Sequence, residues 1–398
     1  MVDAADNARP LKLTAVKKRR RLWRLWMLAA LVLLVVASRF LLAPLRVSSG
    51  SMEPHLHGDP VRGDRMLVLR NYHRFFQPER FDLIVLKDPR QEDSDERDAH
   101  YFVKRLVGLG GESLQIRGGD VYVSVADAPV RVVSKDYRLF RDLLVPVWKE
   151  TFTAPASPFE WREDLVEREG GSVRMRGPQL SRDFPFAGRF IGTIDNSVRN
   201  LDGTVTPGTH RVHDVLLRVT LESDDAAIGF VAELNEMGDT FTFVLHGQRD
   251  GGEVEILHLD ADGRTRSVKA ASKGLVARRR QRIEVWNIDD HQGVAIDGEP
   301  VLQTGGFEVL RPGVGEVWCR PAFSVFGGAA TVACVEIERD LHYLASDPWT
   351  IPQDQVFVLG DNSADSVDSR QYGPVPWSRL VGVPCAIYYP LSRARLLD

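Results

Sequence analysis

Two residues in this chain could together carry out nucleophilic chemistry. Ser51 lies in a Gly-Ser-Met loop, and Lys104 lies within the mostly apolar run of residues 101–107. A serine hydroxyl is a weak nucleophile until a neighbouring base removes its proton. Histidine is the usual base, and His55 and His73 are close to Ser51 in the sequence, but no carboxylate is evident that would orient either ring. A neutral lysine is the other candidate base.

Lys104 could be such a lysine if it is buried. Alternation along a strand puts Lys104 on the same face as Phe102 and Leu106. Lowering a lysine pKa from about 10.4 to about 7–8 requires roughly 3–4 kcal/mol, which burial can supply. The alternative is that Lys104 extends from a strand edge as a solvated charge. Taken alone, this strand favours the solvated lysine.

The elements that must position these residues are mostly short strands, and residues 87–100, which contain the charged run QEDSDERD, are expected to form the loop of a hairpin. The chain has 398 residues, which allows two or three domains, and its 43% hydrophobic and 27% charged residues are typical of a globular protein. The net charge of −4 argues against a basic surface for nucleic acid. Three cysteines without a CxxC motif argue against a disulfide scaffold or a zinc site, and a Cys319–Cys334 pair stays open.

A membrane anchor is predicted near the N-terminus. Residues 1–24 carry eight basic and two acidic side chains, and residues 25–45 are largely apolar apart from Arg39. Twenty-one helical residues would span roughly 30 Å, the thickness of a bilayer's hydrocarbon core. A cleaved signal and a buried core helix are the alternatives. The positive-inside rule then places residues 1–24 in the cytoplasm and everything after Leu45 outside, in a single-pass protein of the cytoplasmic (inner) membrane.

The long middle of the chain, residues 126–340, predicts an inserted antiparallel β-sandwich. Short strand-like runs alternate there with Asp-Gly pairs, which favour tight hairpins. The stretch around residues 283–301 resembles lamin-G or concanavalin-like sandwiches, so the insert is a candidate for binding a protein or a glycan. Its tryptophans are interpreted as core residues rather than as a ligand platform.

Four motifs, taken together, change the interpretation of Lys104. They are SGSMEP, GDRMLV, KRLVGLGG and GDNSADSVDSRQYGPVP, in that order along the chain. This series resembles the type I signal peptidases, which are membrane-anchored Ser/Lys endopeptidases of the S26 type. The resemblance covers residues 17–125 and 340–390, and the GDN…SxDSR…GPVP motif is its most specific part.

The resemblance implies a role for each matching residue. Ser51 matches the nucleophile, Lys104 the general base, Ser49 the side-chain donor of the oxyanion hole, and Ser366 the residue that orients the lysine. Three further residues match the support of the site: Asp361, Asp368 and Arg370. The substrate would lie as an extended strand beside residues 82–86 or beside a neighbouring strand. No metal or cofactor is implied.

The expected function is removal of signal peptides from exported preproteins by an enzyme anchored in the lipid bilayer, without a nucleic-acid partner. The fold is expected to be mainly β, with an N-terminal transmembrane helix, an antiparallel β catalytic domain of the signal-peptidase type and the inserted sandwich. The expected divisions are a basic tail at 1–24, the anchor at 25–45, catalytic parts at 46–125 and 341–398, and the insert at 126–340.

Three alternatives differ in class. The first is a membrane-anchored binding protein that uses the sandwich insert on an inactive peptidase core. The second is a self-cleaving repressor, which would need a DNA-binding head that residues 1–45 do not resemble. The third is a Ser/His/Asp hydrolase that uses His55 or His73. Departures from the family pattern include His55, where a threonine is common, and the insert itself.

Overall fold

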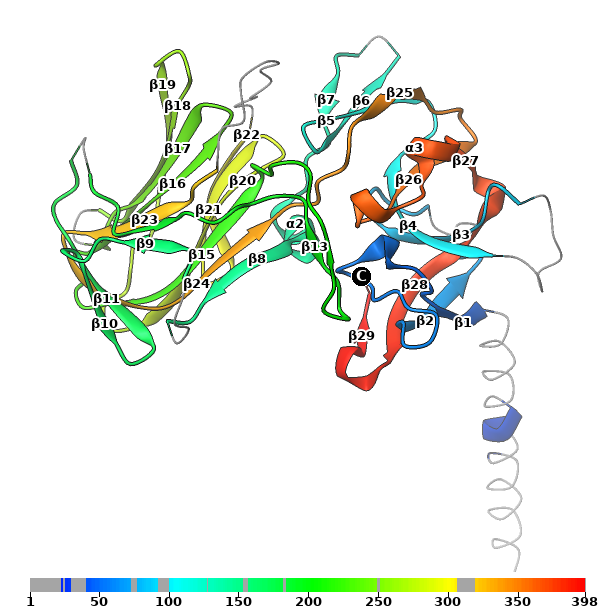
Figure 1. Ribbon diagram of the computed structural model, residues 1–398, viewed down its shortest axis with the longest axis horizontal. Coiled ribbons are helices and arrows are strands. Elements are labelled where there is room, and N and C mark those ends of the chain that lie inside the picture. The colour runs from blue at the N-terminus through cyan, green and yellow to red at the C-terminus, as the bar shows by residue number, and fades with distance from the viewer. Residues whose placement is uncertain are drawn as a thin grey trace, which may run out of the picture.

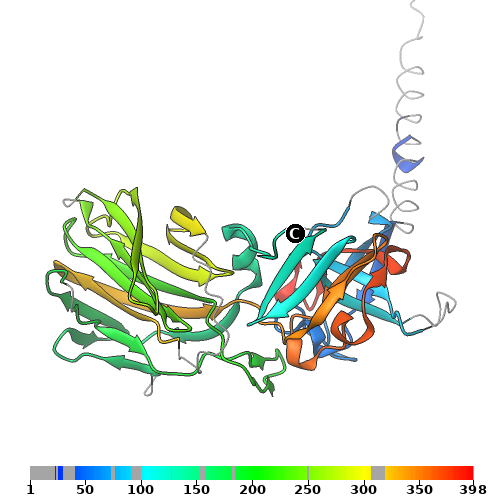
Figure 2. The ribbon, with the colours of Figure 1, turned by 90° about the horizontal axis from the view of Figure 1, so that it is seen from above.

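The computed structural model describes residues 23, 26–29, 41–72, 77–91, 100–126, 128–152, 157–181, 184–248, 251–305 and 319–397. Strands dominate these residues, which confirms the prediction of a mainly β protein. Figures 1 and 2 show two lobes side by side. We call them the terminal lobe, whose strands come from both ends of the chain, and the insert, whose strands come from the middle.

The terminal lobe is built on an antiparallel sheet that interleaves the two ends of the sequence (Figure 1). In spatial order its strands are β1 (Leu42–Arg46), β2 (Arg65–Arg70), β28 (Leu380–Tyr389), β3 (Leu83–Lys87), β4 (Tyr101–Gly108), β26 (Gln355–Leu359) and β27 (Val375–Pro376), with β29 (Arg395–Leu396) beside β28. A second sheet contains β25 (Ser346–Thr350), β5 (Glu112–Arg117), β6 (Asp120–Val125) and β7 (Arg131–Val132). This interleaving pairs residues from the two ends of the chain, such as Leu106 with Val358 and Met66 with Ile387.

The insert consists mainly of two sheets that pack face to face. The first contains β10 (Val166–Glu169), β11 (Ser172–Gly177), β24 (Gly328–Arg339), β15 (Val215–Ser223), β20 (Arg280–Ile288), β21 (His291–Ile296), β22 (Glu299–Gly305) and β8 (Val145–Glu150). The second contains β19 (Thr265–Ala271), β18 (Glu253–Leu259), β17 (Asp239–Leu245), β16 (Gly229–Glu236), β23 (Ala322–Phe326), β12 (Gly188–Phe190) and β9 (Phe159–Trp161). Alternate residues of both sheets fill one core, among them Val219, Phe243 and Val285. A separate hairpin, β13 (Val198–Arg199) and β14 (Val205–Thr206), belongs to neither sheet.

The described helices are short. They are α2 (Tyr137–Leu143), α3 (Ser369–Tyr372) and the 3-10 turns η1 (Gly50–Met52), η4 (Ser363–Asp365), η5 (Trp377–Arg379) and η6 (Leu391–Arg393). Helix α2 begins at Asp136, whose carboxylate accepts two backbone N–H groups of its first turn. Phe140 packs on Trp286 of the insert, whereas Leu143 packs in the core of the terminal lobe. Helix α2 therefore lies at the junction between the two lobes and packs against both of them.

The predicted anchor lies largely outside the described residues. Its last part is corrected by the structure, because residues 42–45 belong to strand β1 rather than to a membrane helix. The apolar residues Ala43 and Leu45 alternate along this strand and pack against the core of the terminal lobe, which explains their hydrophobicity without a bilayer. Among the residues that the structure describes, no helix has the length and apolarity needed to cross a membrane.

Two smaller expectations are also decided. Strands β3 and β4 form the antiparallel hairpin that was predicted around residues 87–100, with Ile84 opposite Lys104. The three cysteines are free thiols, so Cys319 and Cys334 are not joined.

Candidate active site

Ser51 lies in the 3-10 turn η1, which begins directly after the extended residue Ser49. Met52 is fully buried and holds the turn against the core, whereas 7% of the Ser51 residue is exposed. The Ser49 and Ser51 hydroxyl oxygens lie 3.4 Å apart. The Ser51 carbonyl accepts a hydrogen bond of 3.1 Å from the backbone N–H of Asn362. The turn is therefore fastened both to the core and to the loop after β26.

Lys104 is buried in the middle of strand β4. Only 2% of the residue is exposed, and its Nζ donates a hydrogen bond of 3.0 Å to Ser366 Oγ. Loss of hydration on burial lowers the pKa of Lys104 to about 8, although the carboxylates of Asp368 and Asp361 act in the opposite direction. The alternative of a solvated lysine at a strand edge is therefore wrong, because β3 and β26 flank β4 on both sides.

Gly360 brings Ser51, Ser366 and the lysine into one cluster. A Cβ atom placed on Gly360 would lie 2.1 Å from Ser366 Oγ and 2.5 Å from the Ser51 carbonyl oxygen. No side chain fits in that space, so glycine is required where the loop passes between the two serines. This close approach places the hydroxyl that binds Lys104 beside the backbone of Ser51.

Two buried ion pairs hold the loop that carries Ser366. The guanidinium of Arg105 donates to both oxygens of Asp361, over 2.7 and 2.5 Å. Burial alone would raise the pKa of Asp361, but Arg105 holds it well below the usual range. Arg370 binds both oxygens of Asp368 over 2.8 and 2.7 Å, and Asp368 also accepts from the Gly360 N–H. Planar, two-pronged pairs of this kind fix geometry as well as charge.

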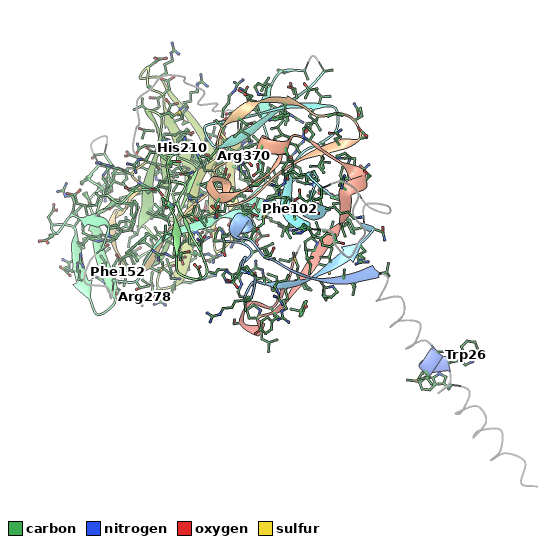
Figure 3. The ribbon with its side chains drawn as sticks, turned by 45° about the vertical axis from the view of Figure 1, so that its right-hand side comes forward. Trp26, Phe102, Phe152, His210, Arg278 and Arg370 are labelled. Atoms are coloured by element: carbon green, nitrogen blue, oxygen red, sulfur yellow. The ribbon has the colours of Figure 1, made fainter. Side chains whose placement is uncertain are left out.

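The structure thus brings together all seven residues singled out from the sequence. Ser49, Ser51, Lys104 and Ser366 form the centre, and Asp361, Asp368 and Arg370 support the adjoining loop. Figure 3 shows Arg370 and Phe102 together in the terminal lobe, apart from Phe152 and Arg278 of the insert.

Sequence reasoning missed several participants. Arg105 enters the sequence analysis only as part of the KRLVGLGG motif. Its charge lies on a strand that is buried on both faces, which requires a carboxylate partner. Asn362 and Glu53, both almost completely buried, were not recognised as contacts of the Ser51 turn. The only sequence signal for them was their position within the two motifs.

His55 corrects a statement made from the sequence. Its Nδ1 lies 2.9 Å from Asp361 Oδ2, so a carboxylate does face this histidine. Asp361 is already bound by Arg105 through both of its oxygens. His73 lies outside the described residues.

Metal ligands occur together at one place in the described part of the chain. His246, Glu253 and Glu255 lie close enough to share an ion. The Lys269 ammonium, however, lies 2.7 Å from Glu253 and 3.2 Å from Glu255. One lysine already pairs with both carboxylates, and the cluster is on the insert rather than beside Ser51.

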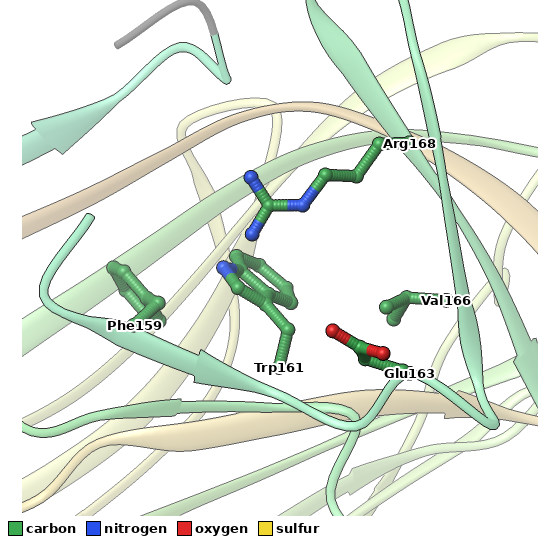
Figure 4. A pocket seen from close by; sticks show the side chains of 5 residues that line it. All are labelled: Phe159, Trp161, Glu163, Val166 and Arg168. Carbon is green, nitrogen blue, oxygen red and sulfur yellow. The ribbon is translucent and has the colours of Figure 1, made fainter. Parts of the chain in front are cut away.

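Two hollows are formed by residues that the structure describes. A cleft of about 980 Å³ runs between the lobes and is lined by His55 and Leu83 of the terminal lobe and by Arg199 and Leu201 of the insert, among others. A smaller pocket of about 400 Å³ on the insert is lined by Phe159, Trp161, Glu163, Val166 and Arg168 (Figure 4).

Comparison with known proteins supports an assignment for the terminal lobe. Residues 20–149 and 291–389, more than half of the chain, match the family described as "Signal peptidase, peptidase S26". Signal peptidase I of Bacillus licheniformis is 31% identical over 102 residues, which are 26% of this chain and 49% of that protein. The probable signal peptidase I of Mycobacterium leprae (strain TN) is 31% identical over 145 residues, covering 29% of this chain and 49% of that protein.

The chain thus spans about half the length of these curated relatives. Among solved structures, a Bacillus licheniformis β-glucanase is 11% identical and covers 48% of this chain and 96% of its own, with a TM-score of 0.33, which is too low to support an inference. The match to the family extends over both halves of the terminal lobe, including Ser51, Lys104 and Ser366, and the chain belongs to the signal peptidase family, peptidase S26.

Proposed function

We propose that this protein is a serine endopeptidase that removes signal peptides from exported preproteins, with Ser51 as the nucleophile and Lys104 as the general base. The observation that carries the proposal is the burial of Lys104 with a pKa of about 8, hydrogen bonded to Ser366 next to the Ser51 turn. A lysine that loses its proton near neutral pH can act as a base.

The proposed mechanism proceeds in two steps. Neutral Lys104 accepts the Ser51 proton, and Ser51 Oγ attacks the scissile carbonyl carbon, whose oxygen becomes negative. The Ser51 N–H and the Ser49 hydroxyl donate hydrogen bonds to that oxygen; loss of one such donor typically costs about 10²–10³ in rate. The protonated lysine then gives its proton to the leaving amine. In the second step Lys104 takes a proton from water, whose oxygen attacks the acyl carbon; the ester bond to Ser51 then breaks, and the lysine returns the proton to Ser51 Oγ.

Strand β3 is the proposed docking site for the extended substrate. Strand β4 covers one side of β3 throughout, whereas β28 pairs with the other side at Val85 and Leu86. Strand β28 therefore occupies part of the edge of β3 that a substrate strand could use. In the described sheet, Leu83 and Ile84 have no paired residue on the β28 side, and Ile84 lies opposite Lys104. A substrate strand added there would lie across β3 from β4, with one strand between it and the proposed base.

We also propose that residues 25–41 anchor the enzyme in the cytoplasmic membrane, with residues 1–24 in the cytoplasm. The run of basic residues followed by the apolar stretch supports this orientation. Protease added outside sealed inverted vesicles would remove only the basic tail, whereas protease added to right-side-out spheroplasts would digest the folded lobes. The reverse pattern would contradict the proposed topology.

The activity is tested with the detergent-purified full chain and a preprotein that carries an Ala-x-Ala cleavage site. The wild type is expected to cut once after the second alanine, and Ser51→Ala and Lys104→Met are each expected to abolish cleavage. Thr265→Val, at an exposed position on strand β19, serves as the matched control. Folded wild-type protein that leaves several such preproteins intact would contradict the proposed function.

A further inference from the structure

An arm of the insert reaches across to the terminal lobe. Residues 195–211 leave the insert, form the β13–β14 hairpin and return (Figures 1 and 2). The base of the arm is cross-linked by a β-bridge between Asp195 and Arg211 and by the Asn196 side chain, which accepts the N–H groups of Thr209 and His210. Arg339 of β24 donates 2.9 Å to the carbonyl of Ser197, which ties the arm to the insert's sheet.

The arm makes two polar contacts with the terminal lobe. The hydroxyl of Thr206, in β14, accepts a hydrogen bond of 3.2 Å from the side-chain amide of Asn362. The backbone N–H of Leu201, in the hairpin turn, donates over 3.3 Å to the carboxylate of Glu53. Both partners are polar residues that are almost completely buried, at 0% and 1% exposure.

Asn362 and Glu53 are the residues that hold the Ser51 turn. The Asn362 side chain donates to the Gly50 carbonyl over 3.2 Å, while its backbone N–H donates to the Ser51 carbonyl over 3.1 Å. Glu53 accepts the Gly58 N–H over 3.2 Å at the other end of the same loop. The arm therefore contacts the nucleophile's loop on both sides of Ser51, through Asn362 before it and directly at the Glu53 side chain after it.

We propose that the β13–β14 hairpin of the insert is a positioning element of the peptidase site. The Thr206 hydroxyl orients Asn362, and the Leu201 N–H orients Glu53, so that the insert fixes the Ser51 turn without touching the reacting atoms. The inference rests on the proposed function of Ser51. The insert would then contribute to catalysis, because Thr206 supplies one hydrogen-bond partner of Asn362 and Leu201 supplies one of Glu53.

The test uses single variants of the full chain. Thr206→Val keeps the shape of the side chain and removes the acceptor, whereas Thr206→Ser keeps the hydroxyl. Thr265→Val makes the same chemical change at an exposed position on the far sheet of the insert. Thr206→Val removes two hydrogen bonds, the one from Asn362 and one of 3.3 Å from the Asn200 side chain within the hairpin. Loss of the neutral bond to Asn362 is expected to lower kcat by about five- to tenfold, because such bonds contribute modestly. The KM is expected to stay within about twofold of wild type.

Rescue distinguishes positioning from general stability. Thr206→Ser and Thr265→Val are expected to retain wild-type kcat within about twofold, and all three variants are expected to unfold at the wild-type temperature. An unchanged kcat in Thr206→Val, or an equal loss in Thr206→Ser, would overturn the proposal.

Hydrogen–deuterium exchange provides a readout that does not require activity. In Thr206→Val the backbone amides of residues 50–58 are expected to exchange several-fold faster than in the wild type and in Thr265→Val. Unchanged exchange at residues 50–58, or faster exchange spread over the whole insert, would overturn the positioning role. If the wild type cleaves no preprotein, the proposed function fails, and the exchange result still decides whether the arm supports the turn.

Discussion

Lys104 sets the pH at which the proposed reaction can start. Because only the neutral amine accepts a proton, and because burial brings its pKa to about 8, kcat/KM is expected to rise about tenfold per pH unit below pH 8 and to level off above it. A pH profile of preprotein cleavage measures this directly. A profile that levels off near pH 6 would instead indicate a histidine base.

The same lysine carries a stability cost. Its pKa in the folded protein is depressed, so the penalty of burying the charge is fully present below pH 8 and disappears as pH rises toward the unfolded value of 10.5. Lys104→Met is therefore expected to be inactive but more stable than the wild type at pH 7, by on the order of 1–3 kcal/mol. Denaturant unfolding at pH 7 checks this, and a less stable variant would contradict the burial argument.

His55 provides the test of the rival mechanism. Although it faces Asp361, the described contacts of this histidine do not include Ser51. His55→Gln is expected to keep preprotein cleavage within about threefold of wild type, whereas Lys104→Met removes it. A loss with His55→Gln as complete as the loss with Lys104→Met would favour a Ser/His/Asp hydrolase.

At the scale of elements, the loop between β26 and η4 depends on the absence of a side chain at Gly360. An added methyl group would collide with Ser366 Oγ and with the Ser51 carbonyl, and neither can move away without disturbing the lysine or the turn. Gly360→Ala is expected to lower kcat/KM at least about 100-fold and to cost about 1–3 kcal/mol in stability.

Ala364→Ser adds one atom at an exposed position in the neighbouring turn and serves as the control for Gly360→Ala. It is expected to behave like the wild type in preprotein cleavage and in thermal unfolding. Wild-type cleavage by Gly360→Ala would show that the close approach of the two serines is not needed.

At the scale of the whole molecule, the junction of the lobes contains more carboxylates than cations. The Lys135 ammonium lies 2.7 Å from both Asp289 and Asp340, and burial together with neighbouring carboxylates raises the pKa of Asp120 and Asp214. Asp120 belongs to the terminal lobe, and the other three aspartates lie in the insert. Docking of the insert on the terminal lobe therefore brings these acidic side chains together and buries them.

Glu236, at the edge of this cluster, allows a test. Burial raises its pKa from 4.5 to about 7, so the wild type loses stability as pH rises through this window. Glu236→Gln is expected to be as stable as the wild type near pH 4.5 and more stable at pH 8, by on the order of 1–3 kcal/mol. Glu299→Gln, at an exposed position, is the control. Equal effects of Glu236→Gln at the two pH values would contradict the argument.

Local patterns predicted much of the fold and of the candidate site. Short alternating runs predicted the β3–β4 hairpin, and the motifs predicted which serines and which lysine would lie together. The same patterns failed where an apolar residue could be buried either in a lipid bilayer or in a protein core. Residues 42–45 fit a membrane span as well as a strand, and only pairing with β2 distinguishes the two.

The reactive residue types and their motifs can be identified in the sequence, because a serine nucleophile needs a base and because the glycines of a tight turn stand next to it in the chain. Tertiary structure alone decided the contacts that join distant segments. Lys104 meets Ser366, Arg105 meets Asp361, and Thr206 meets Asn362 across 156 positions or more. No periodicity records such pairs, since they arise from how sheets close over a core. The depressed pKa of Lys104 follows from that closure, because only the assembled sheet removes water from its amine.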